Sequence, residues 1–209
     1  MALVDQLRLM VITDAGVLKG RDPVETCRQA VAGGRGATII QVRLKDAAPE
    51  EVLALARALV GALAVPVIVN DRVDVALAAG AAGAHLGQED PPLDRLRPHV
   101  PAGFLLGLSV GSPAEAERGR AWPADYWSVG PCFPTANKPD AGVPLGAEGF
   151  GRLAQLAPAG TPVIGIGGVT VANAPTLVRA GAVGVAVIGA VWRARDPAAA
   201  TRALRAAIA

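Results

Sequence analysis

Short runs of aliphatic residues recur along the chain, separated by stretches rich in Ala and Arg. The runs cover residues 7–13, 37–43, 66–70, 83–86, 104–109, 126–129, 162–166 and 184–188. Most of them lack polar alternation, as in VIVN and VGVAVI, which is typical of strands buried on both faces of a parallel sheet. The pattern therefore predicts eight parallel strands.

The stretches between the runs predict helices, one after each strand. Residues 23–32 begin with Pro23, at a first-turn position where proline is favoured, and end at Gly33 and Gly34. Residues 49–63 open with Pro49 and two glutamates and carry Leu and Ala at helical spacing. Further helices are expected over 73–79, 93–97, 114–120, 149–156, 174–180 and 197–208.

Eight strand-then-helix units over residues 1–209 fit a single-domain α/β protein, a (β/α)8 TIM barrel near the short end of its usual length. A doubly wound open sheet has the same order of elements and is the alternative. Polar and glycine-rich segments follow nearly every strand, which favours the closed barrel. The longest loop, 130–146, is rich in Pro and Gly, and loops of this length in compact domains are commonly functional.

The composition excludes several classes of protein. With 52% hydrophobic and 18% charged residues, the chain is neither disordered nor collagen-like. No segment approaches the roughly 20 apolar residues of a membrane-spanning helix. The net charge is +2 without basic runs, which argues against a nucleic-acid partner. We therefore expect small-molecule substrates and no membrane partner.

Cysteine usage and the N-terminal sequence favour a reducing compartment. Cys27 and Cys132 are the two cysteines, and Asp5 stands where a secretory signal would carry basic residues before a long apolar run. We expect a cytoplasmic protein. Its oligomeric state stays open, and a homo-oligomer is compatible with the sequence.

Basic residues follow the second predicted strand. In a TIM barrel the active site lies at the carboxyl ends of the strands. Arg43 and Lys45 lie two positions apart, so in an extended segment both side chains project to the same side and can bind a phosphate or pyrophosphate. An ordinary solvated pair leaving a strand is the alternative.

Two carboxylates follow consecutive strands. Asp71 and Asp90 are expected side by side at the mouth of the barrel, where with Arg43 and Lys45 they could hold a magnesium pyrophosphate. The alternatives are a helix N-cap for Asp71 and a turn before Pro91 for Asp90.

Glycine-rich segments follow the last two strands, at 165–168 and 187–190. The loops after strands seven and eight of such barrels commonly bind phosphate through backbone N–H groups. Tight turns are the alternative explanation for these glycines.

Other reactive residue types give weaker signals. His85 lies inside a strand and is expected to be a hydrogen-bonded core residue, His99 is expected at the surface, and Cys132 has no neighbouring His to activate it. No general base stands out. A reaction in which magnesium pyrophosphate leaves and a neutral atom attacks needs little proton transfer.

Six motifs resemble, in order and spacing, those of the thiamine phosphate synthase family. They are QVRLKD (41–46), VND (69–71), HLGQED (85–90), GLS (107–109), GPCFPTANK (130–138) and GIGG (165–168). The resemblance implies a transferase that joins hydroxymethylpyrimidine pyrophosphate to hydroxyethylthiazole phosphate, or to its carboxylated form. Pyrophosphate leaves first, and the thiazole nitrogen captures the resulting pyrimidine methyl cation.

The resemblance also implies a role for each site residue. The pyrimidine pyrophosphate is bound by Gln41, Val42, Arg43, Leu44, Lys45, Asn70, Ser109 and Lys138, of which Arg43, Lys45, Ser109 and Lys138 are catalytic. The Mg²⁺ cofactor is held by Asp71 and Asp90. The thiazole phosphate is bound by Thr135, Ala136, Asn137, Gly168, Ile188 and Gly189.

Four positions depart from the family's usual residues, namely Leu44, Gly111, Asn137 and Gly189. The related thiazole tautomerases are an alternative, but they use a His near the sixth strand end, where this chain has Pro131. A tautomerase would also have no need of Asp71, Asp90 and Lys138 together. A noncatalytic barrel that binds thiamine precursors is a second alternative, against which the complete set of phosphate and metal ligands argues.

Overall fold

Eight parallel strands close into a barrel in chain order, and β8 pairs with β1. The computed structural model describes residues 2–16, 20–136 and 142–209. The strands are β1 (Leu9–Ile12), β2 (Ile39–Val42), β3 (Val67–Asn70), β4 (Gly83–Leu86), β5 (Leu105–Val110), β6 (Tyr126–Val129), β7 (Val163–Ile166) and β8 (Gly184–Val187). The eight predicted strands and the closed TIM barrel are confirmed.

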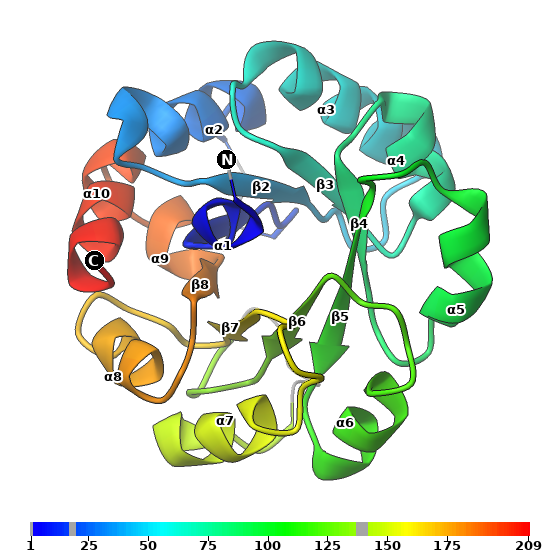
Figure 1. Cartoon of the computed structure of the whole chain (residues 1–209). Helices are drawn as coiled ribbons and strands as arrows, with labels where there is room; N and C mark the ends of the chain where they lie inside the picture. The colour runs from blue at the N-terminus through cyan, green and yellow to red at the C-terminus, as the bar shows by residue number, and fades with distance from the viewer. Residues whose placement is uncertain (1, 17–19, 137–141) are drawn as a thin grey trace.

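The helices form a ring outside the strands (Figure 1). Those predicted from the sequence are α2 (Pro23–Val31), α3 (Pro49–Ala62), α4 (Val73–Ala79), α5 (Leu93–Leu96), α6 (Pro113–Gly119), α7 (Gly146–Ala154), α8 (Ala174–Arg179) and α10 (Pro197–Ala207). Proline occupies the first turn of α2, α3, α6 and α10, where its missing N–H costs no hydrogen bond. The predicted helix at 149–156 begins three residues earlier, at Gly146.

Four short elements were not predicted. They are α1 (Leu3–Gln6), α9 (Gly189–Trp192) and the 3₁₀ turns η1 (Ala32–Gly34) and η2 (Arg97–His99). Elements of three or four residues are too short to show a helical period in the sequence. The α1 helix lies over the amino end of the barrel, where Leu3 packs against the interior cluster (Figure 1).

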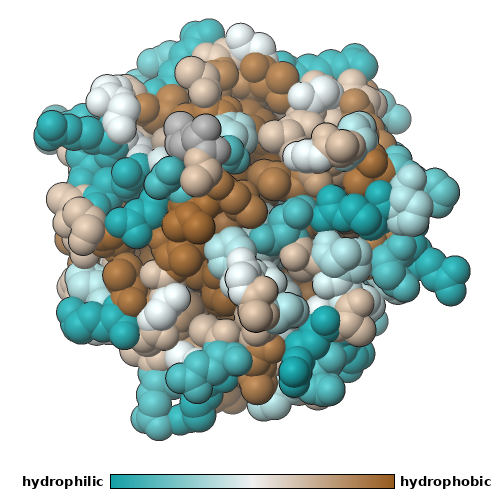
Figure 2. All heavy atoms as spheres, viewed as in Figure 1, coloured by the Kyte–Doolittle hydropathy of each residue, from teal (hydrophilic) through white to brown (hydrophobic). Residues whose placement is uncertain are grey.

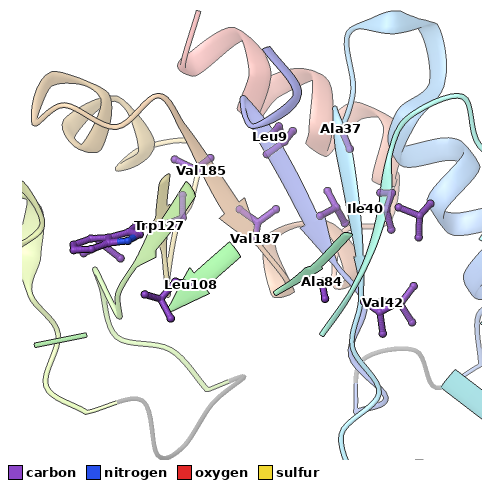
Figure 3. Close-up of a cluster of buried hydrophobic side chains, with 14 of the residues drawn as sticks. Leu9, Ala37, Ile40, Val42, Ala84, Leu108, Trp127, Val185 and Val187 are labelled. Carbon is purple, nitrogen blue, oxygen red and sulfur yellow. The ribbon is translucent and has the colours of Figure 1, made fainter. Parts of the chain in front are cut away.

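The absence of polar alternation in the strands has a simple cause, which is that both faces of the sheet are buried. One set of side chains fills the barrel interior, and it includes Met10, Ile39, Ile68, Tyr126 and Ile164. The alternate positions pack outward against the helices. Figure 3 shows part of this outer cluster, with Leu9, Ile40, Ala84, Leu108, Trp127 and Val185 coming from six different strands.

The surface at the end of the barrel covered by α1 is mixed in polarity. Figure 2 shows hydrophilic residues concentrated at the periphery of this face and hydrophobic residues nearer its centre. Among the described residues, no helix combines the length and apolar character that crossing a membrane requires.

Candidate active site

A cavity of about 1020 Å³ lies at the carboxyl ends of the strands. All eight strands contribute to its wall, as expected for the site of a TIM barrel. The predicted site residues that line it are Gln41, Val42, Arg43, Leu44, Lys45, Asn70, Asp71, Asp90, Ser109, Thr135, Ala136, Gly168, Ile188 and Gly189. The two remaining predicted residues, Asn137 and Lys138, lie outside the described residues.

Arg43 is held in place by the neighbouring strand end. Its guanidinium Nη1 lies 3.0 Å from Asp14 Oδ2, and the two side chains are 17% and 14% exposed. The backbone N–H of Arg43 donates to Thr13 Oγ1, which in turn donates to the Arg43 carbonyl. Arg43 is therefore an ordered cation, and the alternative of a solvated side chain is wrong for it. Lys45 is exposed on the same cavity wall.

Asp71 has an unusual backbone conformation. Its φ of 62° lies in the left-handed region, which few residues other than glycine occupy. Its N–H donates to the carbonyl of His85 on the adjacent strand at 2.8 Å. The N-cap residue of α4 is Arg72, whose own side chain makes no capping hydrogen bond. The alternative in which Asp71 serves as the N-cap is therefore wrong.

Asp90 does close a turn. Its Oδ2 accepts a hydrogen bond from the N–H of Gly87 at 2.6 Å, so the carboxylate is fixed within the loop that follows β4. Because β3 and β4 are neighbours, the loops that carry Asp71 and Asp90 leave the barrel next to each other. Both residues line the cavity.

The loop after β6 is fastened to the end of β7. Cys132 N–H donates to Ile166 O at 2.7 Å, and Phe133 N–H donates to Gly167 O at 2.9 Å. These bonds bring residues 134–136 to the cavity wall. A Cβ at Gly168 would lie 2.4 Å from Pro134 O, and the φ of Gly168 is +62°. A Cβ at Gly167, whose φ is +90°, would likewise lie 2.7 Å from Pro131 Cα, so both glycines are required by the close packing of this loop as well as by their own turn.

Three polar side chains form a chain of hydrogen bonds from the barrel interior to the cavity. His85 Nδ1 lies 2.8 Å from Tyr126 Oη, and His85 Nε2 lies 2.9 Å from Ser109 Oγ. His85 is only 5% exposed, which confirms the prediction of a hydrogen-bonded core histidine. Its ring also reaches the cavity, however, and this contact with the site was not predicted.

The remaining candidate side chains are placed as expected. Cys132 is buried and donates to Val129 O at 3.2 Å, and burial raises the pKa of its thiol to about 12. A thiol with so high a pKa is a poor nucleophile near neutral pH. His99 is exposed.

Two residues that matter to the site were missed by sequence reasoning, namely Asp14 and Tyr126. Asp14 follows the first strand directly, so its position at a strand end was a usable signal. Tyr126 gave no such signal, because its partner is 41 positions away in the sequence and depends on the strand register.

The closed barrel, with cations, carboxylates and glycine turns around one cavity at its carboxyl end, defines the class of protein, which is a TIM-barrel enzyme. The family profile described as thiamine monophosphate synthase matches residues 9–191. This match covers most of the chain, and the chain belongs to that family.

Curated relatives and solved structures agree with the family. The thiamine-phosphate synthase of Roseiflexus castenholzii is 48% identical over 197 residues, which cover 93% of this chain and 85% of the relative. That of Chloroflexus aurantiacus is 44% identical and covers 96% of this chain and 92% of the relative. The structure of a thiamine phosphate pyrophosphorylase from Pyrococcus furiosus has a TM-score of 0.87 at 37% identity, covering 99% of this chain and 98% of that one.

Proposed function

We propose that this chain joins hydroxymethylpyrimidine pyrophosphate to hydroxyethylthiazole phosphate, or to its carboxylated form, with release of pyrophosphate and formation of thiamine phosphate. The family and the curated relatives support this activity, which is that of a transferase. The observation that carries the proposal is that Arg43, Lys45, Asp71 and Asp90 line one cavity. Cations for a pyrophosphate thus stand beside carboxylates for a divalent cation.

The pyrophosphate of the pyrimidine substrate is bound by the β2 side of the cavity. Arg43 supplies an ordered guanidinium, which suits phosphate oxygens because its donors form a planar fork. Lys45 adds a second cation from the exposed rim, and Ser109 adds a hydroxyl donor from β5. Gln41, Val42, Leu44 and Asn70 complete this part of the wall. Lys138, which lies outside the described residues, is the further residue that we assign to this substrate.

The donor set of Asp71 and Asp90 fits Mg²⁺, which prefers oxygen ligands and commonly takes one or two carboxylates plus phosphate oxygens of the substrate. The Gly87 N–H donates to Asp90 Oδ2, which fixes the orientation of the carboxylate, and Oδ1 is the oxygen that we assign to the metal ion. In the part of the chain that the structure describes, no group of three or more His, Cys, Asp or Glu side chains could hold a metal ion. We therefore propose a site in which the two carboxylates hold Mg²⁺ together with phosphate oxygens of the substrate. When bound, Mg²⁺ would neutralise charge on the pyrophosphate.

The thiazole phosphate is bound on the opposite side, by Thr135, Ala136, Asn137, Gly168, Ile188 and Gly189. The described members of this set line the cavity next to the ends of β7 and β8. Backbone N–H groups at these strand ends are the phosphate donors, as in other barrels of this class. The short α9 helix that begins at Gly189 is anchored to β1, because Trp192 Nε1 donates to Ile12 O at 2.7 Å.

The reaction is a dissociative alkyl transfer. Arg43, Lys45, Ser109 and Lys138 stabilise the negative charge that develops on the departing pyrophosphate. The pyrimidine methyl cation that remains is stabilised by its own ring amine, and the thiazole nitrogen attacks it. The nitrogen carries no proton to be removed, so the site needs no general base. A cytoplasmic location belongs to the same proposal, because two free cysteines and soluble substrates are compatible with a reducing compartment.

The proposal is tested by incubating the purified chain with both phosphorylated precursors and Mg²⁺ and measuring thiamine phosphate. Product should form only when both precursors are present, and Arg43→Ala and Lys138→Ala should each lower the rate. Rapid isomerisation of the thiazole without thiamine phosphate would assign the chain to the tautomerases instead. Tight precursor binding without any reaction would leave a noncatalytic binding barrel.

A further inference from the structure

We propose that His85 and Tyr126 are positioning residues that orient the hydroxyl group of Ser109. Tyr126 fixes the imidazole of His85 with its proton on Nε2, and that N–H donates to Ser109 Oγ. The hydroxyl proton of Ser109 is then left to donate into the cavity. The inference rests on the proposed function in one respect, which is that Ser109 binds the pyrimidine pyrophosphate.

The register of three neighbouring strands brings the two rings together. His85 on β4 pairs with Gly107 on β5, and Gly107 pairs with Tyr126 on β6. A Cβ at Gly107 would lie 2.4 Å from His85 Nδ1 and 2.2 Å from Tyr126 Cζ. Because position 107 carries no side chain, the histidine and tyrosine meet across β5 with their ring centroids 5.5 Å apart.

The burial of Tyr126 decides the direction of the hydrogen bonds. Tyr126 is fully buried, and burial raises the pKa of its phenol, so the hydroxyl keeps its proton. Within the described residues, His85 Nδ1 is the hydrogen-bond partner of that hydroxyl. If Nδ1 carried the proton, the phenol proton would be buried without an acceptor, which is costly. Nδ1 is therefore the acceptor, and in a neutral imidazole the proton then lies on Nε2.

Ser109 is held at two points, at its hydroxyl by His85 and at its carbonyl by Gln88. His85 Nε2 donates to Ser109 Oγ at 2.9 Å, which occupies a lone pair of the hydroxyl and leaves its own proton for another acceptor. Gln88 Nε2 donates to the Ser109 carbonyl at 2.8 Å, and Arg118 Nε donates to Gln88 Oε1 at 3.3 Å. His85 and Gln88, both in the HLGQED motif, thus fix the side chain and the backbone of Ser109 in the cavity wall.

The position of the proton can be measured without any substrate, by ¹⁵N NMR of the imidazole rings. The chain has 2 His, so the spectrum is simple, and His99→Gln assigns the remaining signals to His85. We expect His85 to carry its proton on Nε2 in the native protein and to lose this preference in Tyr126→Phe. A proton on Nδ1, or a preference that Tyr126→Phe leaves unchanged, would overturn the proposal.

A double-mutant cycle tests whether the effect reaches the substrate through Ser109. Tyr126→Phe should raise the KM for the pyrimidine pyrophosphate by about tenfold and leave the KM for the thiazole phosphate unchanged. In a Ser109→Ala background the same substitution should have no further effect. Losses that multiply in the double variant would show a general structural role and overturn the proposal.

Thr201→Val is the matched control, because it also removes a buried hydroxyl but lies on α10 and lines no part of the cavity. It should leave both KM values unchanged. If the wild-type chain makes no thiamine phosphate, the proposed function fails, whereas the NMR measurement still decides the proton position by itself.

Discussion

Arg43 and Asp14 form an ion pair that joins the carboxyl ends of β1 and β2. Their Nη1 and Oδ2 atoms lie 3.0 Å apart, and both side chains are largely shielded from solvent. Such a pair restricts the guanidinium to one orientation before any substrate arrives. The pair also lowers the net positive charge of this wall. We expect the orientation of the guanidinium to matter more for substrate binding than the charge that Asp14 offsets.

Replacing Asp14 tests that balance. Asp14→Ala should raise the KM for the pyrimidine pyrophosphate by about tenfold, since the guanidinium loses its anchor. Asp14→Asn should have a smaller effect, because its amide oxygen still accepts a hydrogen bond from Arg43. Steady-state kinetics with each substrate varied in turn gives both values.

The control for this prediction is Glu148→Ala, which removes the acidic partner of Arg152 in an exposed ion pair on α7. Exposed pairs contribute little, so neither KM should change. Lower KM values in both Asp14 variants would mean that the carboxylate opposes substrate binding, which would contradict an orienting role for Asp14.

Replacing Asp90 separates the two halves of the site. Asp90→Asn removes the charge but keeps an oxygen that accepts from the Gly87 N–H, so the turn should survive. We expect Mg²⁺-dependent binding of the pyrimidine pyrophosphate to weaken by at least about tenfold, with thiazole phosphate binding unchanged. Calorimetric titrations with and without Mg²⁺ measure both. Equal loss of the two ligands would refute the division of the cavity.

Two glycine substitutions should change stability in opposite directions. Gly107→Ala inserts a Cβ within 2.4 Å of both His85 and Tyr126, and overpacking of this kind costs about 1–3 kcal/mol. Gly61→Ala, within α3 and with nothing within 4 Å of the new Cβ, should stabilise the protein by up to about 1 kcal/mol. Urea unfolding measures both free energies. A neutral Gly107→Ala would show that the interior is not as tightly packed as described.

The buried thiols predict a loss of stability at high pH. Burial raises the pKa of Cys27 and of Cys132 from an ordinary value of 9.0 to about 12. Between these pH values the unfolded chain releases the thiol protons while the folded chain keeps them, so stability falls as pH rises through this window. Below the ordinary thiol pKa of 9.0 the folded and unfolded chains both keep the thiol protons, so the stabilisation that the buried thiols provide is fully present.

A Cys27→Ala, Cys132→Ala variant isolates this contribution. It should lose packing energy equally at every pH, but its free energy of unfolding should fall less steeply than that of the wild type between about pH 9 and about pH 12. Unfolding curves at a series of pH values give the comparison. Parallel profiles would mean that the thiols do not titrate as described.

Much of the fold was predictable because both faces of each strand are buried. Runs such as VIVN therefore stand out from the helical stretches, and Pro23, Pro49 and Pro197 mark helix starts by local chemistry alone. The α1 and α9 helices were missed because four residues show no period. Strand ends were equally informative, since Arg43, Asp71 and Asp90 all reach the cavity.

Contacts between strands were not predictable in the same way. The Arg43–Asp14 and His85–Tyr126 pairs depend on strand register, which a sequence pattern does not specify. The left-handed conformation of Asp71 could not be predicted either, because glycine is the residue that usually marks this conformation in a sequence and position 71 carries an aspartate. Candidate residues for the site could be predicted from their positions at strand ends, whereas the strand register determines how those residues are oriented.

Whether this chain joins the two precursors can be observed by ³¹P NMR of the purified chain with both phosphorylated precursors and Mg²⁺ in one tube. We expect the pyrimidine pyrophosphate and thiazole phosphate signals to decline together while pyrophosphate and thiamine phosphate grow in equal amounts. Loss of the thiazole phosphate signal alone, with the pyrimidine pyrophosphate intact, would contradict it.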